Sequence, residues 1–158
     1  MSKFLLIVWL IGVLSQDTQT PGNLNAFIGK LSEEDIEIVE YAFKESSQAD
    51  INPEKFIRLI WCESQFEPRG GDYSTTTQKY HSWGLLQFQR PTFNYLSKNS
   101  GIQGDYKDSF TQIKLAVWTI NYDSKGLNHW WTCSRRAKFT NKDYIKKSLK
   151  ENLTLNSF

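Results

Sequence analysis

The chain has little of the charge excess that nucleic-acid binding requires. Its 19 Lys and Arg residues nearly balance its 17 Asp and Glu residues, for a formal net charge of +2. A large excess of positive charge is the usual basis of nonspecific nucleic-acid binding. The near balance therefore gives no case for a nucleic-acid partner. The chain also has no internal repeat or low-complexity region, and its 158 residues suit one modest domain.

A hydrophobic run long enough to cross a membrane comfortably is lacking as well. The run over residues 4–14 has eleven residues, whereas a spanning helix needs about 20. Lys3 precedes this run, and Val13-Leu14-Ser15 suits signal-peptidase cleavage before Gln16. We therefore expect residues 1–15 to be a signal peptide, with an uncleaved N-terminal anchor as the alternative. The rest of the chain is then exported, and it is secreted, periplasmic or associated with the cell envelope.

Cysteine is scarce, with Cys62 and Cys133 as its two occurrences. Two cysteines in an exported chain favour one disulfide. It would close a loop of about 70 residues and stabilise the fold by about 4 kcal/mol in the chain-entropy model. The alternatives are two free buried thiols, or a zinc site completed by His81 and His129. Because these spacings match no usual zinc pattern, we predict neither a metal nor another cofactor.

Capping residues indicate several helices. Ser32 with Asp35 opens one that runs to about Ser46, Asn52 followed by Pro53 opens a second, and Asp108 opens a third. We expect a shorter helix over residues 92–98, a Gly-, Ser- and Thr-rich loop over 67–80, a brief strand or turn over 82–88 and a turn over 125–128. This pattern predicts a mainly α fold with a small strand and loop region.

The second predicted helix carries a carboxylate on its apolar face. Glu63 continues a stripe of apolar residues at three- and four-residue spacing: Phe56, Leu59 and Ile60. Burying an ionised carboxylate is costly, so Glu63 is either paired with a cation such as Arg58 or Arg69, or its pKa is raised. The negative end of the helix dipole raises the pKa further. A carboxyl group that stays protonated near neutral pH is suited to general acid catalysis.

Three motifs around this residue resemble one enzyme family. The segments Cys62-Glu63-Ser64, Gly84-Leu85-Leu86-Gln87-Phe88 and Pro91-Thr92-Phe93 resemble the catalytic core of the lytic transglycosylases with a goose-lysozyme-like SLT domain. Trp130-Trp131-Thr132-Cys133 resembles the related resuscitation-promoting factors, in which a Cys beside the catalytic Glu pairs with a late Cys. The resemblance covers residues 51–136. It implies a lysozyme-like α+β fold with a glycan cleft.

The resemblance also implies a reaction on peptidoglycan. Glu63 would protonate the β-1,4 oxygen between N-acetylmuramic acid and N-acetylglucosamine, and would then deprotonate the 6-hydroxyl group to close a 1,6-anhydro ring. Most glycosidases use two carboxylates, but Glu67 and Asp72 have no motif around them and are interpreted as surface residues. A hydrolytic muramidase is the first alternative. A wall-binding module without turnover is the second.

Further cleft residues follow from the same motifs. We expect Ser64 to orient Glu63 or bind substrate, Gly84 to let the backbone approach the sugar, and Gln87 to line the cleft. Aromatic rings stack on sugars, so the aromatic candidates are Trp83, Trp118, Tyr122 and Trp130. The segment from Trp118 to Tyr122 departs from the family's Tyr-Asn pattern, so the aromatic residue that supports the cleft from behind is not assigned.

The remaining expectations concern organisation and partners. Residues 16–30 are predicted to be a linker, 31–150 the lysozyme-like domain with its core over 51–136, and 151–158 a tail. Residues 135–150 are rich in Lys and Arg, with Asp143 as the single acid. Such a segment is either a solvated face or a site for anionic envelope polymers or a membrane surface. We expect a monomer that binds peptidoglycan strands.

Overall fold

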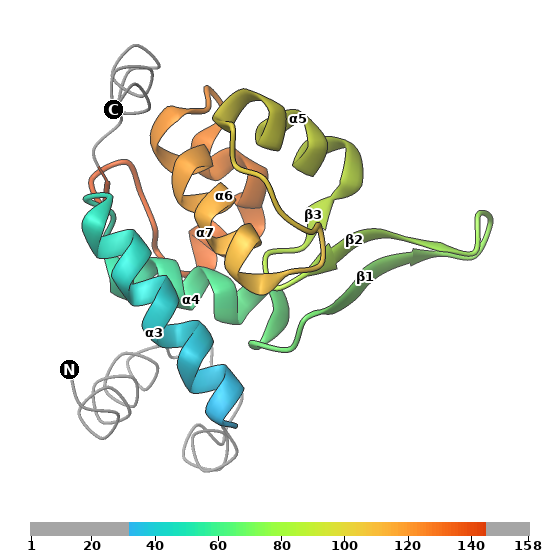
Figure 1. Ribbon diagram of the computed structural model, residues 1–158, viewed down its shortest axis with the longest axis horizontal. Coiled ribbons are helices and arrows are strands. Elements are labelled where there is room, and N and C mark those ends of the chain that lie inside the picture. The colour runs from blue at the N-terminus through green and yellow to red at the C-terminus, as the bar shows by residue number, and fades with distance from the viewer. Residues whose placement is uncertain (1–31, 145–158) are drawn as a thin grey trace.

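Five α-helices, one 3₁₀ helix and a three-stranded sheet form the part of the chain that a computed structural model describes, residues 32–144 (Figure 1). In chain order the elements are α3 (Glu33–Gln48), α4 (Pro53–Ser64), β1 (Arg69–Ser74), β2 (Lys79–Gly84), β3 (Phe88–Gln89), α5 (Arg90–Ser100), α6 (Ser109–Tyr122), the 3₁₀ helix η1 (Gly126–Trp130) and α7 (Trp131–Arg136). The fold is mainly α with a small sheet, as the sequence predicts. The predicted signal peptide, linker and tail lie outside the described residues.

The three predicted helix starts are confirmed by their caps. The Ser32 hydroxyl accepts a hydrogen bond from the Asp35 N–H (3.1 Å), and the Asp35 carboxylate accepts one from the Ser32 N–H (2.8 Å). The side chains of Asn52 and Asp108 likewise accept from the backbone N–H three residues on, at 3.2 Å and 2.7 Å. Each cap satisfies a backbone donor that the first helical turn leaves unpaired.

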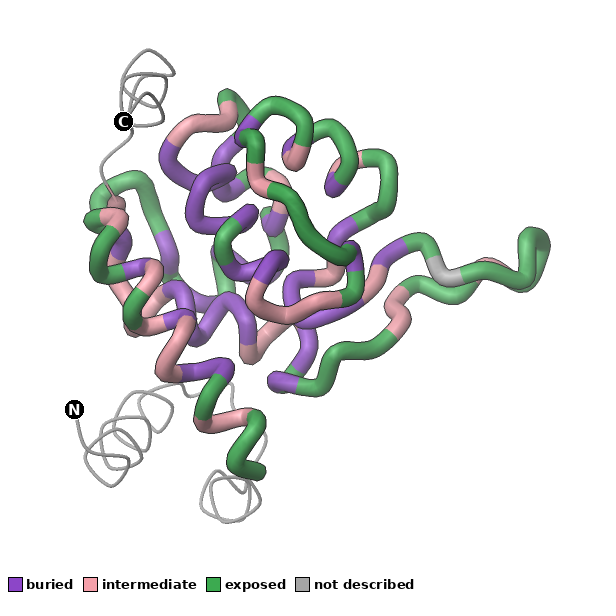
Figure 2. Tube along the Cα trace, in the orientation of Figure 1, coloured by how far each residue is buried: buried purple, intermediate pink, exposed green. Residues whose placement is uncertain are grey.

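Helices α4 and α6 contribute many of the buried side chains of the core (Figure 2). Helix α3 packs against both of them, and α7 packs against α4. The apolar face of α4 is completely buried, with no exposure at Phe56, Leu59 or Ile60. Contacts on several sides therefore fix the end of α4, which carries Glu63.

The sheet is a hairpin with a short third strand. β1 pairs antiparallel with β2, β2 pairs antiparallel with β3, and the β1–β2 hairpin projects from the helical body (Figure 1). The expected loop over residues 67–80 was therefore wrong, since β1 and the start of β2 fall within it. Gly70, Gly71 and the nearby Ser and Thr residues lack the alternation of apolar residues that marks a half-buried strand. Cross-strand backbone hydrogen bonds form this ladder without that pattern.

Two other boundaries differ from the sequence-based expectation. The helix expected over 92–98 extends over Arg90–Ser100, because Pro91 fits the first turn and Gly101 (φ 73°) ends it. The turn expected over 125–128 is the beginning of η1, which leads directly into α7. A hydrogen bond from the Asn128 N–H to the Lys125 carbonyl (2.9 Å) closes that turn.

A disulfide joins Cys62 near the end of α4 to Cys133 in α7, with a Cα–Cα distance of 5.5 Å. This confirms the predicted disulfide. Because both sulfurs are bonded to each other, neither is available as a zinc thiolate. No helix within residues 32–144 is long and apolar enough to cross a bilayer. The basic segment is described only as far as residue 144, so residues 145–150 lie outside the structure.

Candidate active site

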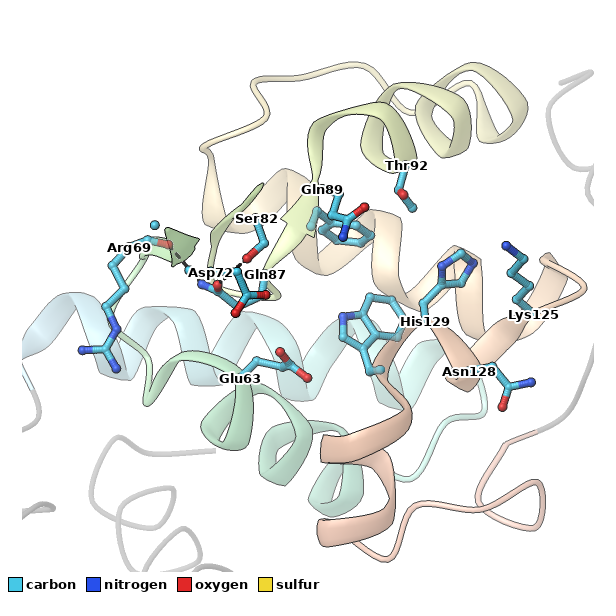
Figure 3. Close-up of a pocket in the computed structure, with 14 residues that line it drawn as sticks. Glu63, Arg69, Asp72, Ser82, Gln87, Gln89, Thr92, Lys125, Asn128 and His129 are labelled. Carbon is cyan, nitrogen blue, oxygen red and sulfur yellow. Dashed lines mark hydrogen bonds between the residues drawn. The ribbon is translucent and has the colours of Figure 1, made fainter. Parts of the chain in front are cut away.

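A cavity of about 630 Å³ lies where the end of α4, the base of the hairpin, the start of α5 and η1 meet (Figure 3). Its walls come from segments that are far apart in the chain. The lining residues are Glu63, Arg69, Gly70, Gly71, Asp72, Ser82, Gln87, Phe88, Gln89, Thr92, Lys125, Asn128, His129 and Trp130.

Glu63 enters the cavity from the last turn of α4. The helix stops at Ser64 because Gln65 and Phe66 adopt left-handed backbone angles, φ 58° and 63°. Phe66 is buried and packs against Trp61, with the ring centroids 5.8 Å apart. This sharp exit carries the chain away from α4 and leaves the Glu63 side chain at the cavity wall.

The cations considered as partners of Glu63 have other carboxylates. Arg58 forms an ion pair with Glu54 at 3.0 Å, and Arg69 forms one with Glu67 at 3.2 Å. The structure therefore supports the raised-pKa alternative for Glu63 and gives no support to a pairing with Arg58 or Arg69.

Burial is the main cause of a raised pKa at Glu63. The negative charge of Asp72 raises it further, and Arg136 lowers it in part, so the pKa rises from 4.5 to about 7. Both directions follow from elementary electrostatics, since desolvation and a like charge each disfavour the ionised form. Asp72, interpreted from sequence as a surface residue, is exposed but lines the same cavity. Asp72 comes close to Glu63 because β1 and β2 pair as a hairpin, which the sequence analysis did not predict.

The Gln87 side chain joins the two sides of the hairpin base. Its amide nitrogen donates to the carbonyls of Arg69 (3.0 Å) and Gly84 (2.7 Å), and its amide oxygen accepts from the Ser82 hydroxyl (2.9 Å). A Cβ at Gly71 would lie 1.8 Å from that amide oxygen, so a larger residue there would displace the Gln87 amide. Gln87 lines the cavity as expected, and its hydrogen bonds hold the wall in shape.

Gln112, which the sequence analysis did not single out, holds the segment from Trp83 to Leu86 in place from the side of the core. It is completely buried on α6, where its oxygen accepts from the Leu86 N–H (2.9 Å) and its nitrogen donates to the carbonyls of Trp83 (3.1 Å) and Tyr106 (2.7 Å). A Cβ at Gly84 (φ 87°) would lie 2.1 Å from the Gln112 nitrogen. Gly84 therefore lets the backbone lie close to Gln112. The sequence analysis had expected it to let the backbone lie close to a sugar.

The other predicted cleft residues divide between those that line the cavity and those that lie outside it. Trp130 lines the cavity, and its indole N–H donates to the Leu86 carbonyl (2.8 Å). Ser64 is buried and donates to the Ile60 carbonyl (3.3 Å). The predicted cleft residues that do not line this cavity are Ser64, Trp83, Gly84, Trp118 and Tyr122. Trp118 instead stacks on Tyr122 at 5.8 Å, and Lys107 lies 4.3 Å from the Trp83 ring centroid.

The wall opposite the hairpin carries Lys125, Asn128 and His129, which the sequence did not suggest as cleft residues (Figure 3). The His129 Nε2–H donates to the Asp123 carboxylate at 2.9 Å. Burial opposes ionisation of Asp123, but hydrogen bonds from His129 and from the N–H groups of Lys125 and Gly126 lower its pKa overall. The 3₁₀ geometry of η1 brings these residues together, and no sequence motif marks it.

A family model described as the transglycosylase SLT domain matches residues 40–135, more than half of the chain. The matched range contains every residue that lines the cavity. A search of curated proteins and a search of solved structures each give no match. The family match agrees with the first resemblance seen in the sequence, and the likeness to resuscitation-promoting factors stays a prediction.

Proposed function

The chain belongs to the transglycosylase SLT family of enzymes, which cleave the glycan strands of peptidoglycan, and we propose that Glu63 is its single catalytic acid–base. One observation carries the proposal: Glu63 lines an open polar cavity and has a pKa of about 7. Near neutral pH a large fraction of such a carboxyl group is protonated, whereas an ordinary glutamate is ionised.

In the proposed first step, the protonated Glu63 carboxyl donates its proton to the glycosidic oxygen between N-acetylmuramic acid and N-acetylglucosamine. The bond from the anomeric carbon to that oxygen breaks, and the leaving sugar departs with a neutral hydroxyl group. The N-acetyl group of the muramic acid residue stabilises the positive charge at the anomeric carbon. Glu63 is now a carboxylate, and Asp72 favours its return to the protonated form.

In the second step, the Glu63 carboxylate removes the proton from the 6-hydroxyl group of the same muramic acid residue. The freed oxygen attacks the anomeric carbon and closes the 1,6-anhydro ring. Glu63 recovers its proton, so one carboxyl group serves both steps and no water is consumed. Trp130 and the hydrogen-bonded Gln87 form fixed parts of the wall against which the strand lies in this proposal.

One observation favours a second candidate, a hydrolytic muramidase. Asp72 lies in the same cavity as Glu63 and interacts with it electrostatically. Hydrolytic glycosidases usually use two carboxylates in one cleft. In that case Asp72 would activate water or stabilise the cation, and the product would carry a reducing end.

Mass spectrometry of muropeptides released from purified peptidoglycan separates these candidates. We expect the wild-type protein to release 1,6-anhydro products and Glu63→Gln to lower the rate by about 10²–10⁴-fold, the usual range for loss of a general acid–base group. Reducing products that disappear in Asp72→Asn would establish the muramidase instead. Folded, oxidised protein that sediments with the wall but releases nothing would indicate a wall-binding module.

We also propose that the chain acts outside the cytoplasm, where its substrate lies. The disulfide between Cys62 and Cys133 agrees with an oxidising compartment. The predicted signal peptide over residues 1–15 would provide the route. Detection of a mature N-terminus at Gln16 in protein recovered from the cell envelope or medium would test that route.

A further inference from the structure

We propose that one side of α7, together with the turn that follows it, is a docking surface for a membrane that contains anionic lipids. Three exposed residues, Trp131, Arg135 and Lys138, make up this surface, and we call it the basic face. The composition of residues 135–150 leaves open whether the segment is a solvated face or a binding site. The inference goes beyond the proposed function, because it concerns where the protein is held and not the reaction at Glu63.

The basic face is fixed to the folded body by the opposite side of α7. The buried residues on that side are Cys133, Ser134 and Ala137, and the disulfide of Cys133 ties the helix to α4. Trp131, Arg135 and Lys138 follow one another at spacings of four and three residues, which places them on one side of the helix. The Lys138 N–H donates to the Arg135 carbonyl (3.1 Å), so the turn that carries Lys138 is closed on the end of α7.

The apolar part of the basic face is the Trp131 ring. This side chain is 60% exposed, whereas Trp130 directly before it is 5% exposed. The Arg135 guanidinium carbon lies 5.1 Å from the centroid of the Trp131 ring. Tryptophan is enriched at the headgroup level of bilayers, where the ring reaches the apolar layer and a neighbouring cation meets the phosphates. A dissolved polyanion would use the cations and would offer no apolar layer to the ring.

The charge around Trp131 is positive and not neutralised. Residues 131–142 contain no acid, and their four cations are all exposed: Arg135, Arg136, Lys138 and Lys142. The ion pairs within residues 32–144 use other basic residues, namely Arg58, Arg69 and His129. The next acid, Asp143, accepts from the N–H (2.7 Å) and the hydroxyl (3.0 Å) of Thr140. Each cation near an anionic bilayer strengthens binding about fivefold, so this charge complements an anionic membrane.

The basic face adjoins the cleft. Trp130 ends η1 and lines the cavity, and Trp131 begins α7. Arg136, at the end of α7, acts electrostatically on Glu63. A bilayer at the basic face therefore lies near the cleft, and the docked protein meets the glycan strands that are nearest to the membrane.

Partition into vesicles tests the inference without relying on turnover. The full chain would be mixed with vesicles of phosphatidylcholine alone or with about 30% phosphatidylglycerol at about 0.1 M salt, and sedimentation would give the two partition coefficients. Any contribution of the apolar run over residues 4–14 is common to both vesicles, so the ratio of the coefficients reports on charge. We expect a ratio well above one that falls as salt is added.

Two variants locate this binding on the basic face. Arg135→Gln with Lys138→Gln should lower the ratio by about 30-fold, which is about fivefold for each charge. Trp131→Ala should weaken binding to the anionic vesicles several-fold, because the ring no longer enters the interface. Arg136 is left unchanged, since it acts on Glu63.

Matched controls come from exposed positions elsewhere. Lys44→Gln with Lys98→Gln removes two charges from α3 and α5, and Tyr95→Ala removes a ring that is 61% exposed. Both should change the ratio little. Equal partition into the two vesicles, or an equal loss in the Lys44 and Lys98 variant, would overturn the inference. So would binding to soluble polyphosphate that is as tight as binding to vesicles, with no effect of Trp131→Ala on either, because the face would then be a polyanion site.

Discussion

At the scale of single residues, the proposed mechanism depends on the protonation of Glu63. Burial and Asp72 raise its pKa to about 7, and Arg136 opposes them. The two charged residues reach Glu63 from different elements, Asp72 from β1 and Arg136 from the end of α7. Each can therefore be changed without altering α4, and the two changes have opposite expected signs.

The pH dependence of kcat/KM follows from this arrangement. In the proposed mechanism the protonated form of Glu63 is the active form of the free enzyme, so kcat/KM should be flat below about pH 7 and fall about tenfold per pH unit above it. Asp72→Asn removes a like charge and should move this limb to lower pH. Arg136→Gln removes an opposite charge and should move it to higher pH. Initial rates on soluble glycan strands, measured across pH, locate the alkaline limb of kcat/KM. A shift of that limb in the same direction in both variants would contradict the electrostatic account.

The same raised pKa predicts that Glu63 lowers stability at neutral and alkaline pH. The folded-state pKa lies above the unfolded value near 4.5, so the folded state binds more protons between these values and loses stability as pH rises from about 4.5 to about 7. Glu63→Gln removes this loss. We expect the variant to be more stable than wild type by up to about 3 kcal/mol above pH 7, with little difference below pH 4.5.

Urea denaturation of both proteins across pH 4–8 measures this difference. Glu34→Gln, an exposed position on α3, corrects for the general effect of removing one negative charge. A stability difference between wild type and Glu63→Gln that stays constant with pH would show that Glu63 is not held protonated by the fold.

At the scale of the elements, the disulfide joins α4, which carries Glu63, to α7, which begins directly after Trp130. Cys62 directly precedes Glu63 in α4, and Cys133 lies in α7, three residues after Trp130. The closed loop spans 71 residues, for which the chain-entropy model gives about 4 kcal/mol. Cys62→Ala with Cys133→Ala should lower the free energy of unfolding by roughly this amount.

Reduction supplies the control for the disulfide. A reductant should destabilise the wild-type protein to about the level of the double alanine variant and should leave that variant unaffected. Activity measured well below both unfolding temperatures then reports on geometry alone. If the folded variant keeps full activity, the disulfide stabilises the fold without positioning Glu63.

The elements that the sequence predicted well are those with local determinants. Helices α3, α4 and α6 were predicted from a cap and an apolar stripe, and the position of Glu63 on α4 followed from the same stripe. The hairpin was missed, since its pairing is between strands whose residues lack an apolar alternation. Lys125, Asn128 and His129 were missed for a related reason. Their place in the cleft depends on long-range contacts of η1, such as the hydrogen bond from Trp130 to the Leu86 carbonyl, 44 residues earlier.

At the scale of the molecule, the C-terminal part of the described chain supports the start of α4. Ile51 and Tyr144 form a β-bridge, and the Asn52 N–H donates to the Asp143 carbonyl at 2.7 Å. Asn52 is the N-cap of α4, whose other end carries Glu63. The Tyr144 ring also packs on Phe139, with the centroids 6.2 Å apart. A segment near residue 144 therefore belongs to the same folded unit as the cleft.

Two truncations test this support. Residues 32–144 contain the family match, the cleft and the bridge, so this shortened chain should fold and cleave peptidoglycan at close to the full-length rate. Residues 32–139 lack the bridge and leave the Asn52 N–H without its acceptor, which should lower the free energy of unfolding by about 1–3 kcal/mol. Thermal unfolding measured on both truncations gives the difference in stability that these contacts contribute. If the two chains were equally stable, the contacts at Asp143 and Tyr144 would not contribute to the position of α4.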